Sequence, residues 1–294
     1  MTDKDATKGI RLMIAAVTVF AMQDGFSRHL AETYNTFMVI MIRYWFFAGF
    51  VVALALRQPQ GFAAAIRTHH PWLHLMRASL LVAEVCVIVY GYTLIGLINS
   101  HAIFAVCPLL VAGLAVPLLG ERISWQRWVA IGAGLVGVLI ILQPGSGVFS
   151  LASLLPLAAA TMFAVYSLLT RLTTRDEPAF VALFWSAVIG AVLVTAIGLP
   201  KWEPMAGDDW LWMTVYALLA ILGNWLLIRC YEVAEASSVQ PFAYLQIVLV
   251  TLIGIIVYDE ALRTPVLIGG AIVVVAGLFA LLHSRSQAKV VLPQ

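Results

Sequence analysis

Charged residues are scarce in this chain. Only 11% of its 294 residues are Asp, Glu, Lys or Arg and 62% are hydrophobic, whereas soluble domains carry roughly 25% charged residues. So few charges cannot cover a water-facing surface, which excludes an ordinary soluble domain. Together with a mean hydropathy of +0.97, this composition indicates an all-α polytopic membrane protein.

Basic clusters and cysteines are also scarce. The formal net charge is +2, and the Lys and Arg residues are scattered between apolar stretches. A nucleic-acid-binding face needs clustered basic side chains, so no nucleic-acid partner is expected. The three cysteines, Cys86, Cys107 and Cys230, lie inside apolar stretches. We interpret them as small hydrophobic residues, because an odd number of buried cysteines is not a disulfide framework.

Long apolar runs are what the chain has in abundance. A helix that crosses the bilayer core needs about 20 mainly apolar residues. The sequence predicts ten spans, of which the fifth and tenth are short, at 10–29, 36–56, 72–93, 98–119, 125–142, 151–170, 179–199, 210–230, 239–258 and 265–282. No small-residue cleavage pattern follows the first run, so we expect a retained helix there and not a signal peptide.

The loops predict an orientation. With the N-terminus in the cytoplasm, the outer loops hold only Arg28, Lys201 and Arg263. The inner segments hold eleven basic residues: Lys4, Lys8, Arg11, Arg57, Arg67, Arg122, Arg127, Arg171, Arg175, Arg285 and Lys289. This bias predicts a cytoplasmic N-terminus, and ten spans return the C-terminus to the cytoplasm.

The chain also repeats itself. A shift of 139 residues superposes Glu121 on Glu260 and Tyr92 on Tyr231, and a Gly-rich span follows each acidic position. Each half contains five predicted spans, an odd number, so the second half is inverted relative to the first. Inverted repeats are typical of secondary transporters, which alternate access to a site near the membrane midplane.

Three local motifs connect this pattern to a known family. The motif Cys-Pro-Leu-Leu at 107–110, the motif Leu-Gly-Glu-Arg-Ile-Ser at 119–124 and the glycines at 132, 134 and 137 resemble the EamA-type branch of the drug/metabolite transporter superfamily. The resemblance implies two five-helix repeats, at 1–147 and 148–294, around a central cavity lined by spans one to four and six to nine. Spans five and ten would lie at the periphery. The second repeat departs from the motif, since Ile247 replaces Pro108.

A narrower resemblance lies within that family. The segment 20–28, together with Arg43 and Arg77, is similar to proteobacterial members that include S-adenosylmethionine uptake carriers.

Ionisable groups inside spans are the strongest site candidates, because each costs a few kcal/mol at the bilayer centre. Glu84 lies near the middle of span three. We interpret it as a proton-coupling carboxylate or a counter-ion for a cationic or zwitterionic substrate, with a structural carboxyl as the alternative. Asp24 and Arg43 lie at similar depths in spans one and two, so they could pair as a clamp or outer gate. Arg43 could instead bind a substrate carboxylate.

Other polar residues of the spans receive simpler interpretations. We expect Arg77 and Arg229 to extend to the headgroups, although Arg229 could instead line an inner vestibule. Tyr92 and Tyr231 are expected to lie at the membrane interfaces. The cluster His69, His70 and His74 is expected to be solvated. No metal site is expected there, because no Cys or paired carboxylates accompany the histidines.

Polar and aromatic residues crowd the spans that would line a cavity. Besides the charged candidates, the substrate-binding or coupling candidates are Gln23, Asn99, His101, Tyr166, Asn224, Trp225, Gln240, Tyr244 and Gln246. Such a lining suits an amphipathic organic solute. Pro108 and Pro241 are hinge candidates, because proline interrupts helical hydrogen bonding. Glycines in spans five and ten predict close helix contact, within the fold or across a homodimer.

The leading hypothesis is a secondary active transporter of a bacterial inner membrane. It would move a small organic metabolite, such as an amino acid or an S-adenosylmethionine-like compound, by proton coupling or exchange and without a cofactor. No nucleotide-binding motif is present, so ATP drive is not expected. The alternative is a membrane-embedded enzyme acting on a lipid or small metabolite, but the adjacent Ser100 and His101 face about 100° apart on a helix. A channel is disfavoured, because titratable groups occur singly and not in rings.

Overall fold

The chain forms a helical bundle in a computed structural model that describes residues 3–120, 125–142, 150–234 and 239–290. No strand occurs in these described ranges. The α-helices are α1 (Asp3–Thr33), α2 (Thr36–Leu56), α3 (Phe62–Ala65), α4 (Pro71–Ile95), α5 (Leu97–Phe104), α6 (Cys107–Leu119), α7 (Trp125–Leu142), α8 (Leu154–Thr173), α9 (Ala179–Gly198), α10 (Asp209–Val233), α12 (Leu245–Tyr258) and α13 (Thr264–Val290). Short 3₁₀ helices are η1 (Leu151–Ser153), η2 (Leu199–Lys201) and η3 (Gln240–Tyr244).

Within the described ranges, seven helical stretches are long and apolar enough to cross a membrane: Thr7–Thr33, Thr36–Leu56, Pro71–Ile95, Leu97–Leu119, Leu151–Thr173, Ala179–Lys201 and Asp209–Val233. The same ranges contain three shorter apolar helices, Trp128–Leu142, Phe242–Tyr258 and Thr264–Ala276. The protein is therefore an all-helical, multi-pass membrane protein.

Local sequence signals set several helix ends. The Asn35 side chain accepts a hydrogen bond from the Phe37 N–H and caps the start of α2. Pro71 occupies the first turn of α4, where its missing N–H costs nothing. Gly120 ends α6 in the left-handed conformation, at φ 70°, which glycine adopts without strain.

The fourth predicted span is broken near its middle. Residues 105–106 separate α5 from α6, and Pro108 lies in the first turn of α6. Proline cannot donate the backbone hydrogen bond that would continue a helix, so a new helix begins there. The ninth predicted span also begins irregularly, with η3 leading into α12. Both irregular segments lie beside the cavities described below.

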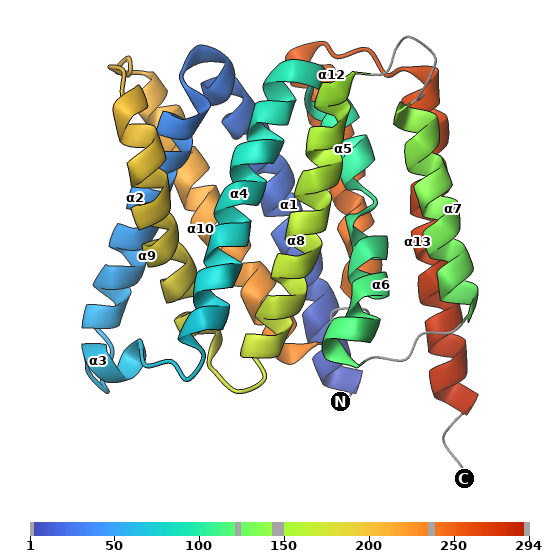
Figure 1. The fold of residues 1–294 in the computed structure, drawn as a ribbon, viewed down its shortest axis with the longest axis horizontal. Coiled ribbons are helices and arrows are strands. Elements are labelled where there is room, and N and C mark those ends of the chain that lie inside the picture. Colours follow the sequence, from blue (N-terminus) through green and yellow to red (C-terminus); the bar gives the residue numbers. More distant parts are fainter. Residues whose placement is uncertain (1–2, 121–124, 143–149, 235–238, 291–294) are drawn as a thin grey trace.

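Helices α7 and α13 pack side by side at one edge of the bundle (Figure 1). This placement confirms the periphery expected for spans five and ten. The two helices come close at Gly137 and Gly269, where a Cβ added to Gly137 would lie 2.7 Å from the Gly269 carbonyl oxygen. The predicted glycine-mediated contact is therefore present, and it lies within one chain.

Alanine at Gly137 is expected to destabilise the α7–α13 pair, although alanine is the better helix former. The added methyl would press on the backbone of α13, and overpacking costs about 1–3 kcal/mol. Gly132→Ala is the matched control, because nothing lies within 4 Å of a Cβ there. Melting temperatures in detergent should fall for Gly137→Ala and hold or rise for Gly132→Ala. An equal response of both variants would contradict the close contact.

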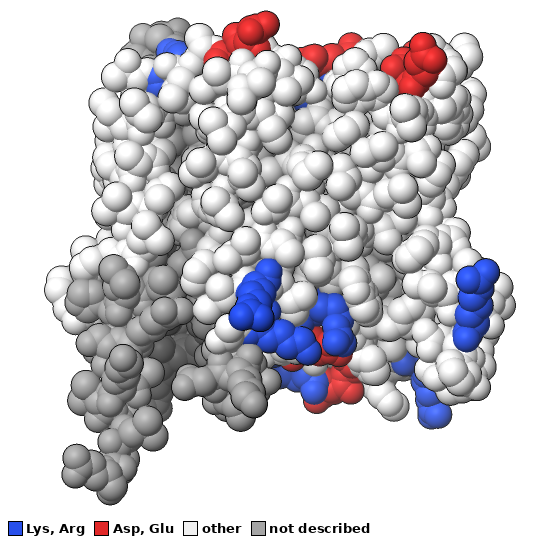
Figure 2. Space-filling model, turned by 180° about the vertical axis from the view of Figure 1, so that it is seen from behind, with Lys and Arg blue, Asp and Glu red and all other residues white. Residues whose placement is uncertain are grey.

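Charges gather at the two ends of the bundle. Figure 2 shows Lys and Arg mainly at the end where α1 begins and α13 ends, and Asp and Glu at both ends. The band between them is almost free of charge on the face shown. An uncharged belt between two charged rims is the surface that a bilayer requires.

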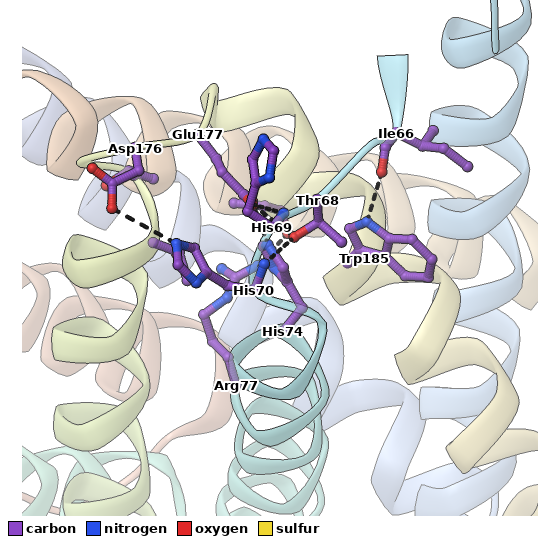
Figure 3. Close-up of polar contacts among 12 residues, drawn as sticks. Ile66, Thr68, His69, His70, His74, Arg77, Asp176, Glu177 and Trp185 are labelled. Atoms are coloured by element: carbon purple, nitrogen blue, oxygen red, sulfur yellow. Dashed lines mark hydrogen bonds and ion pairs between the residues drawn. The ribbon is translucent and has the colours of Figure 1, made fainter. Parts of the chain in front are cut away.

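A buried polar cluster joins α4 to α8 and α9 near the start of α4 (Figure 3). We call it the His74 cluster: Thr68, His74, Arg77, Thr170 and Glu177. His74 and Arg77 are fully buried, so the expectation of a solvated His74 and of an Arg77 extending to the headgroups is wrong. Both side chains have polar partners inside the protein, and these offset the cost of burial.

Hydrogen bonds fix the protonation state of His74. An Arg77 Nη2 group lies 3.3 Å from His74 Nδ1, and a guanidinium can only donate. Nδ1 is therefore an acceptor, and the proton lies on Nε2, which donates to Glu177 Oε2 over 2.7 Å. Arg77 also donates to Thr170 Oγ1 of α8 over 3.1 Å and to the Ala182 carbonyl of α9. His74 is thus a neutral bridge between an anion and a cation.

Glu177 lies between α8 and α9, outside the apolar spans. Burial favours its neutral form, but hydrogen bonds from His74, Thr68 and the His69 N–H outweigh burial and lower its pKa below the ordinary 4.5. Because the pKa of Glu177 is lower in the folded state, the ionised carboxylate stabilises the fold above pH 4.5. This stabilisation is lost as the pH falls through the folded-state pKa.

Acidification is therefore expected to lower the melting temperature of the wild type more than that of Glu177→Gln, which has no proton to gain. Melting curves from about pH 6 to about pH 3 measure this difference. Asp176→Asn is the control, since the Asp176 side chain is 70% exposed, and it should retain the wild-type pH dependence. Identical pH profiles for Glu177→Gln and the wild type would contradict the stabilising role.

Candidate functional site

Two adjoining cavities lie between the halves of the chain. The first, the polar cavity, encloses about 540 Å³ and is lined by Phe20, Gln23, Asp24, Arg43, Leu81, Glu84, Val85, Ile88, Val89, Tyr92, His101, Phe104, Phe163, Asn224 and Gln246. The second, the aromatic cavity, encloses about 530 Å³ and adds Met13, Val17, Ala105, Cys107, Pro108, Leu227, Tyr231, Ala243, Tyr244 and Ile247. Both are lined by Phe20, His101, Phe104, Phe163 and Gln246.

The lining departs from the family expectation at one helix. The residues of both cavities come from α1, α2, α4, α5, α6, α8, α10, η3 and α12. None comes from α9, the seventh predicted span, which packs against α2 and α4.

Asp24 is held by two helices other than its own. Its Oδ2 lies 3.1 Å from His101 Nε2 of α5 and accepts a 3.0 Å hydrogen bond from Gln246 Nε2 of α12. The Tyr92 hydroxyl of α4 lies 2.9 Å from the same His101 nitrogen, and the two rings stack. The structure therefore pairs Asp24 with His101, where the sequence suggested Arg43.

Glu84 differs from Asp24 in having no polar partner in the part of the chain that the structure describes. Its side chain is 6% exposed and lines the polar cavity. Within the described residues its carboxyl group makes no hydrogen bond and no ion pair. Arg43 and Asp24 act on it only through longer-range Coulombic interactions. A buried carboxyl group without local donors is suited to gaining and losing a proton or to binding a ligand.

Arg43 is the cation of the polar cavity, and it is 2% exposed. Its Nη1 lies 3.4 Å from the Tyr216 hydroxyl, and its guanidinium lies 5.4 Å and 5.5 Å from the ring centres of Tyr44 and Tyr216. Its Nε has no hydrogen-bond partner in the described part of the chain. The buried Oε1 of Gln23 and the hydroxyl of Tyr244 are also without partners there. Such unpaired buried groups in a cavity lining indicate where a polar ligand binds.

The remaining sequence candidates divide into four groups. Asn224 lines the polar cavity and donates to the Ala220 carbonyl, while Pro108 lines the aromatic cavity. Tyr166 is buried, Trp225 contacts Arg229, and neither lines these cavities. Asn99 lines a separate cavity and donates to the Ile95 carbonyl. The side chains of Gln240 and Pro241 lie outside the described residues.

Several lining residues were not found from the sequence. Tyr92 and Tyr231 are 2% and 0% exposed and line the cavities, so their expected place at the membrane interface is wrong. Phe104 and Phe163 were not candidates, yet their ring centres lie 5.8 Å apart in both linings. Aromatic residues near the middle of predicted cavity spans are the signal that could have identified them.

Comparisons with known proteins agree with this architecture. The EamA-like transporter family model matches residues 7–143 and again residues 150–282. The two matches correspond to the two halves recognised as a repeat in the sequence. A solved crystal structure that is 17% identical superposes with a TM-score of 0.68 over 98% of this chain and 99% of that chain, and it supports the fold.

Similar proteins are named as transporters. An "S-adenosylmethionine uptake transporter" of Rickettsia bellii is 27% identical over 95% of both chains. "Riboflavin transporters" of Vibrio cholerae and Rhizobium johnstonii are 27% identical over 92% of both chains and 31% identical over 74% of this chain and 72% of the relative. The expectation of a transporter and not an enzyme is confirmed by the family and these relatives. The chain belongs to the EamA-like transporter family.

Proposed function

We propose that this protein is a secondary active transporter that moves a small amphipathic metabolite across a bacterial inner membrane by alternating access. One observation carries the proposal: Glu84, a buried carboxyl group with no hydrogen-bond or ion-pair partner among the described residues, lines a cavity shared by helices of both halves. A carboxyl group so placed can bind a proton from one side of the membrane and release it to the other.

The proposed topology has ten spans, as five-helix repeats at 1–147 and 148–294, with both termini in the cytoplasm. The charge distribution supports this orientation, because the basic end of the molecule is the end that carries the start of α1 and the end of α13 (Figures 1 and 2). The interruption before α6 and the 3₁₀ start of α12 are the proposed hinges, at Pro108 and near Pro241.

The adjoining cavities support an amphipathic substrate. The polar cavity offers a carboxylate, a guanidinium and amides, and the aromatic cavity offers rings and aliphatic side chains. A zwitterionic or cationic head group in the first and an apolar body in the second would satisfy both linings. S-adenosylmethionine and riboflavin are the first compounds to test, because similar proteins are named for their transport.

Uptake by proteoliposomes tests the proposal. Purified protein is reconstituted, and uptake of labelled S-adenosylmethionine, riboflavin and a panel of amino acids is measured with and without an inward proton gradient. We expect at least one compound to accumulate above its external concentration, and a protonophore to abolish that accumulation. Protein-free liposomes are the control. The proposed function is wrong if no compound enters the proteoliposomes faster than it enters protein-free liposomes. It is also wrong if the protein chemically converts a compound without moving it across the membrane.

A further inference from the structure

The polar cavity contains one guanidinium and two carboxyl groups in unequal environments. Asp24 is satisfied by His101 and Gln246 at hydrogen-bond distance, whereas Glu84 has no such partner in the described residues. Arg43 forms no ion pair with either carboxyl group in that part of the chain, and its Nε is unpaired. Asp24 and His101 therefore already have polar partners within the protein. Arg43 and Glu84 are the charges that remain free to interact with a substrate.

We infer that Arg43 binds a carboxylate group of the substrate and that Glu84 takes up one proton when this carboxylate arrives. The inference rests on the proposed transport function and names the chemistry of the substrate: an organic carboxylate with an aromatic or otherwise apolar body. The bound species is then one carboxylate and one proton, so the pair adds no net charge to the cavity.

Charge balance supports this coupling. In the unloaded cavity Arg43 acts on Glu84 at longer range and favours its ionised form, against the effect of burial. A substrate carboxylate on Arg43 would leave two anions competing for one cation in a medium of low dielectric constant, where an uncompensated charge is costly. Protonation of Glu84 removes the excess charge. The proton comes from the water on the side to which the cavity is open, resides on a Glu84 carboxyl oxygen, and leaves with the substrate on the other side.

Guanidinium geometry favours a carboxylate as the ligand. Arginine presents paired donors that match the two oxygens of a carboxylate, and Nε of Arg43 has no other partner in the described structure. The ring pair Phe104 and Phe163 lies between the polar and aromatic cavities. An apolar body attached to the carboxylate can therefore extend from Arg43 past these rings.

Among the described residues, no other charged group near Glu84 can take the role of Arg43 or Glu84. The titratable groups that act on Glu84 or share its cavity are Asp24 of α1, Arg43 and Tyr44 of α2, Cys86 and Tyr92 of α4, His101 of α5, Cys107 of α6 and Tyr166 of α8. Tyrosine hydroxyls and cysteine thiols are ordinarily neutral at neutral pH. Asp24 and His101 are engaged with each other.

Proton uptake on ligand binding tests the inference. The probes are S-adenosylmethionine, phenylalanine and indole-3-acetate, each compared with its carboxamide, and riboflavin, which has no carboxylate. They are added to weakly buffered, detergent-solubilised protein that contains a pH-sensitive dye, and binding is followed by thermal shift. We expect a carboxylate probe to bind at least about tenfold more tightly than its amide, a factor equal to about 1.4 kcal/mol, with uptake of one proton.

Three variants separate the roles of the two residues. Glu84→Gln should bind the carboxylate without proton uptake, because its amide already resembles the protonated side chain. Arg43→Gln should lose the preference for carboxylate over amide, and Arg43→Lys should keep part of it. Arg175→Gln, at an exposed arginine outside the cavities, should behave like the wild type.

Several results would overturn the inference. They are equal binding of acid and amide, binding of a carboxylate without proton uptake in the wild type, or binding by none of the carboxylate probes. Proton-independent uptake of riboflavin by proteoliposomes would overturn it while leaving the transport function intact. Absence of flux for every compound would instead contradict the proposed function.

Discussion

Replacing Glu84 with glutamine is expected to abolish uphill accumulation of substrate in a pH gradient while downhill exchange continues. Glutamine resembles a carboxyl group that is permanently protonated, so the cavity can still load and reorient but cannot exchange a proton. Uptake driven by a pH gradient should fall at least about tenfold, to the level set by equilibration. Counterflow of labelled against unlabelled substrate should persist.

A matched control is Glu32→Gln, at a carboxylate whose side chain is 43% exposed and pairs with Arg28 outside the cavities. It should retain pH-driven accumulation. Both variants must be reconstituted in equal amounts, so that loss of transport is not loss of protein. Undiminished accumulation by Glu84→Gln would remove Glu84 from the coupling mechanism.

Removal of the Arg77 side chain is expected to cause the largest loss of stability. Arg77 is fully buried and donates to His74, Thr170 and the Ala182 carbonyl. Arg77→Ala leaves these acceptors and the Glu177 carboxylate without the cation that balances them. Breaking a buried charged network typically costs about 3–5 kcal/mol, so the melting temperature in detergent should drop sharply.

Arg175→Ala is the comparison for Arg77→Ala, since it removes the same charge from an exposed side chain between α8 and α9. It should change the melting temperature little, because exposed charges contribute at most about 1 kcal/mol. Arg77→Lys should fall between the two, as lysine keeps the charge but not the planar set of donors. Similar melting temperatures for Arg77→Ala and Arg175→Ala would contradict a stabilising role for the His74 cluster.

The sequence predicted the helical class, the repeat and the placement of Glu84 in a cavity lining, because these depend on composition, periodicity and depth along a span. It did not predict which helices meet. Asp24 and Arg43 lie at similar depths in adjacent spans, yet Asp24 faces His101 and Gln246, and Gln246 is 222 positions away along the chain. Depth along a span follows from counting residues, whereas rotation about the helix axis depends on tertiary packing.

Two other differences between the sequence predictions and the structure also arise from tertiary packing. Tyr92 was assigned to the membrane interface from its position near a predicted span end, but α4 continues to Ile95 and directs this side chain into the bundle. His74 lies 103 positions before its partner Glu177 in the sequence, so the residues around His74 and Arg77 do not show why these side chains are buried. A buried polar residue can be recognised from local sequence only when its partner is also local.

The central claim is that the cavity between the two halves opens to one side of the membrane at a time. Cysteine labelling at Val89, which lines the polar cavity, tests it most directly in a protein whose Cys86, Cys107 and Cys230 have been replaced. A membrane-impermeant maleimide is applied to right-side-out and inside-out vesicles across a range of pH. The account predicts labelling from both sides, with labelling from one face rising as labelling from the other falls. Labelling from one face only, or a parallel rise from both faces, would contradict alternating access.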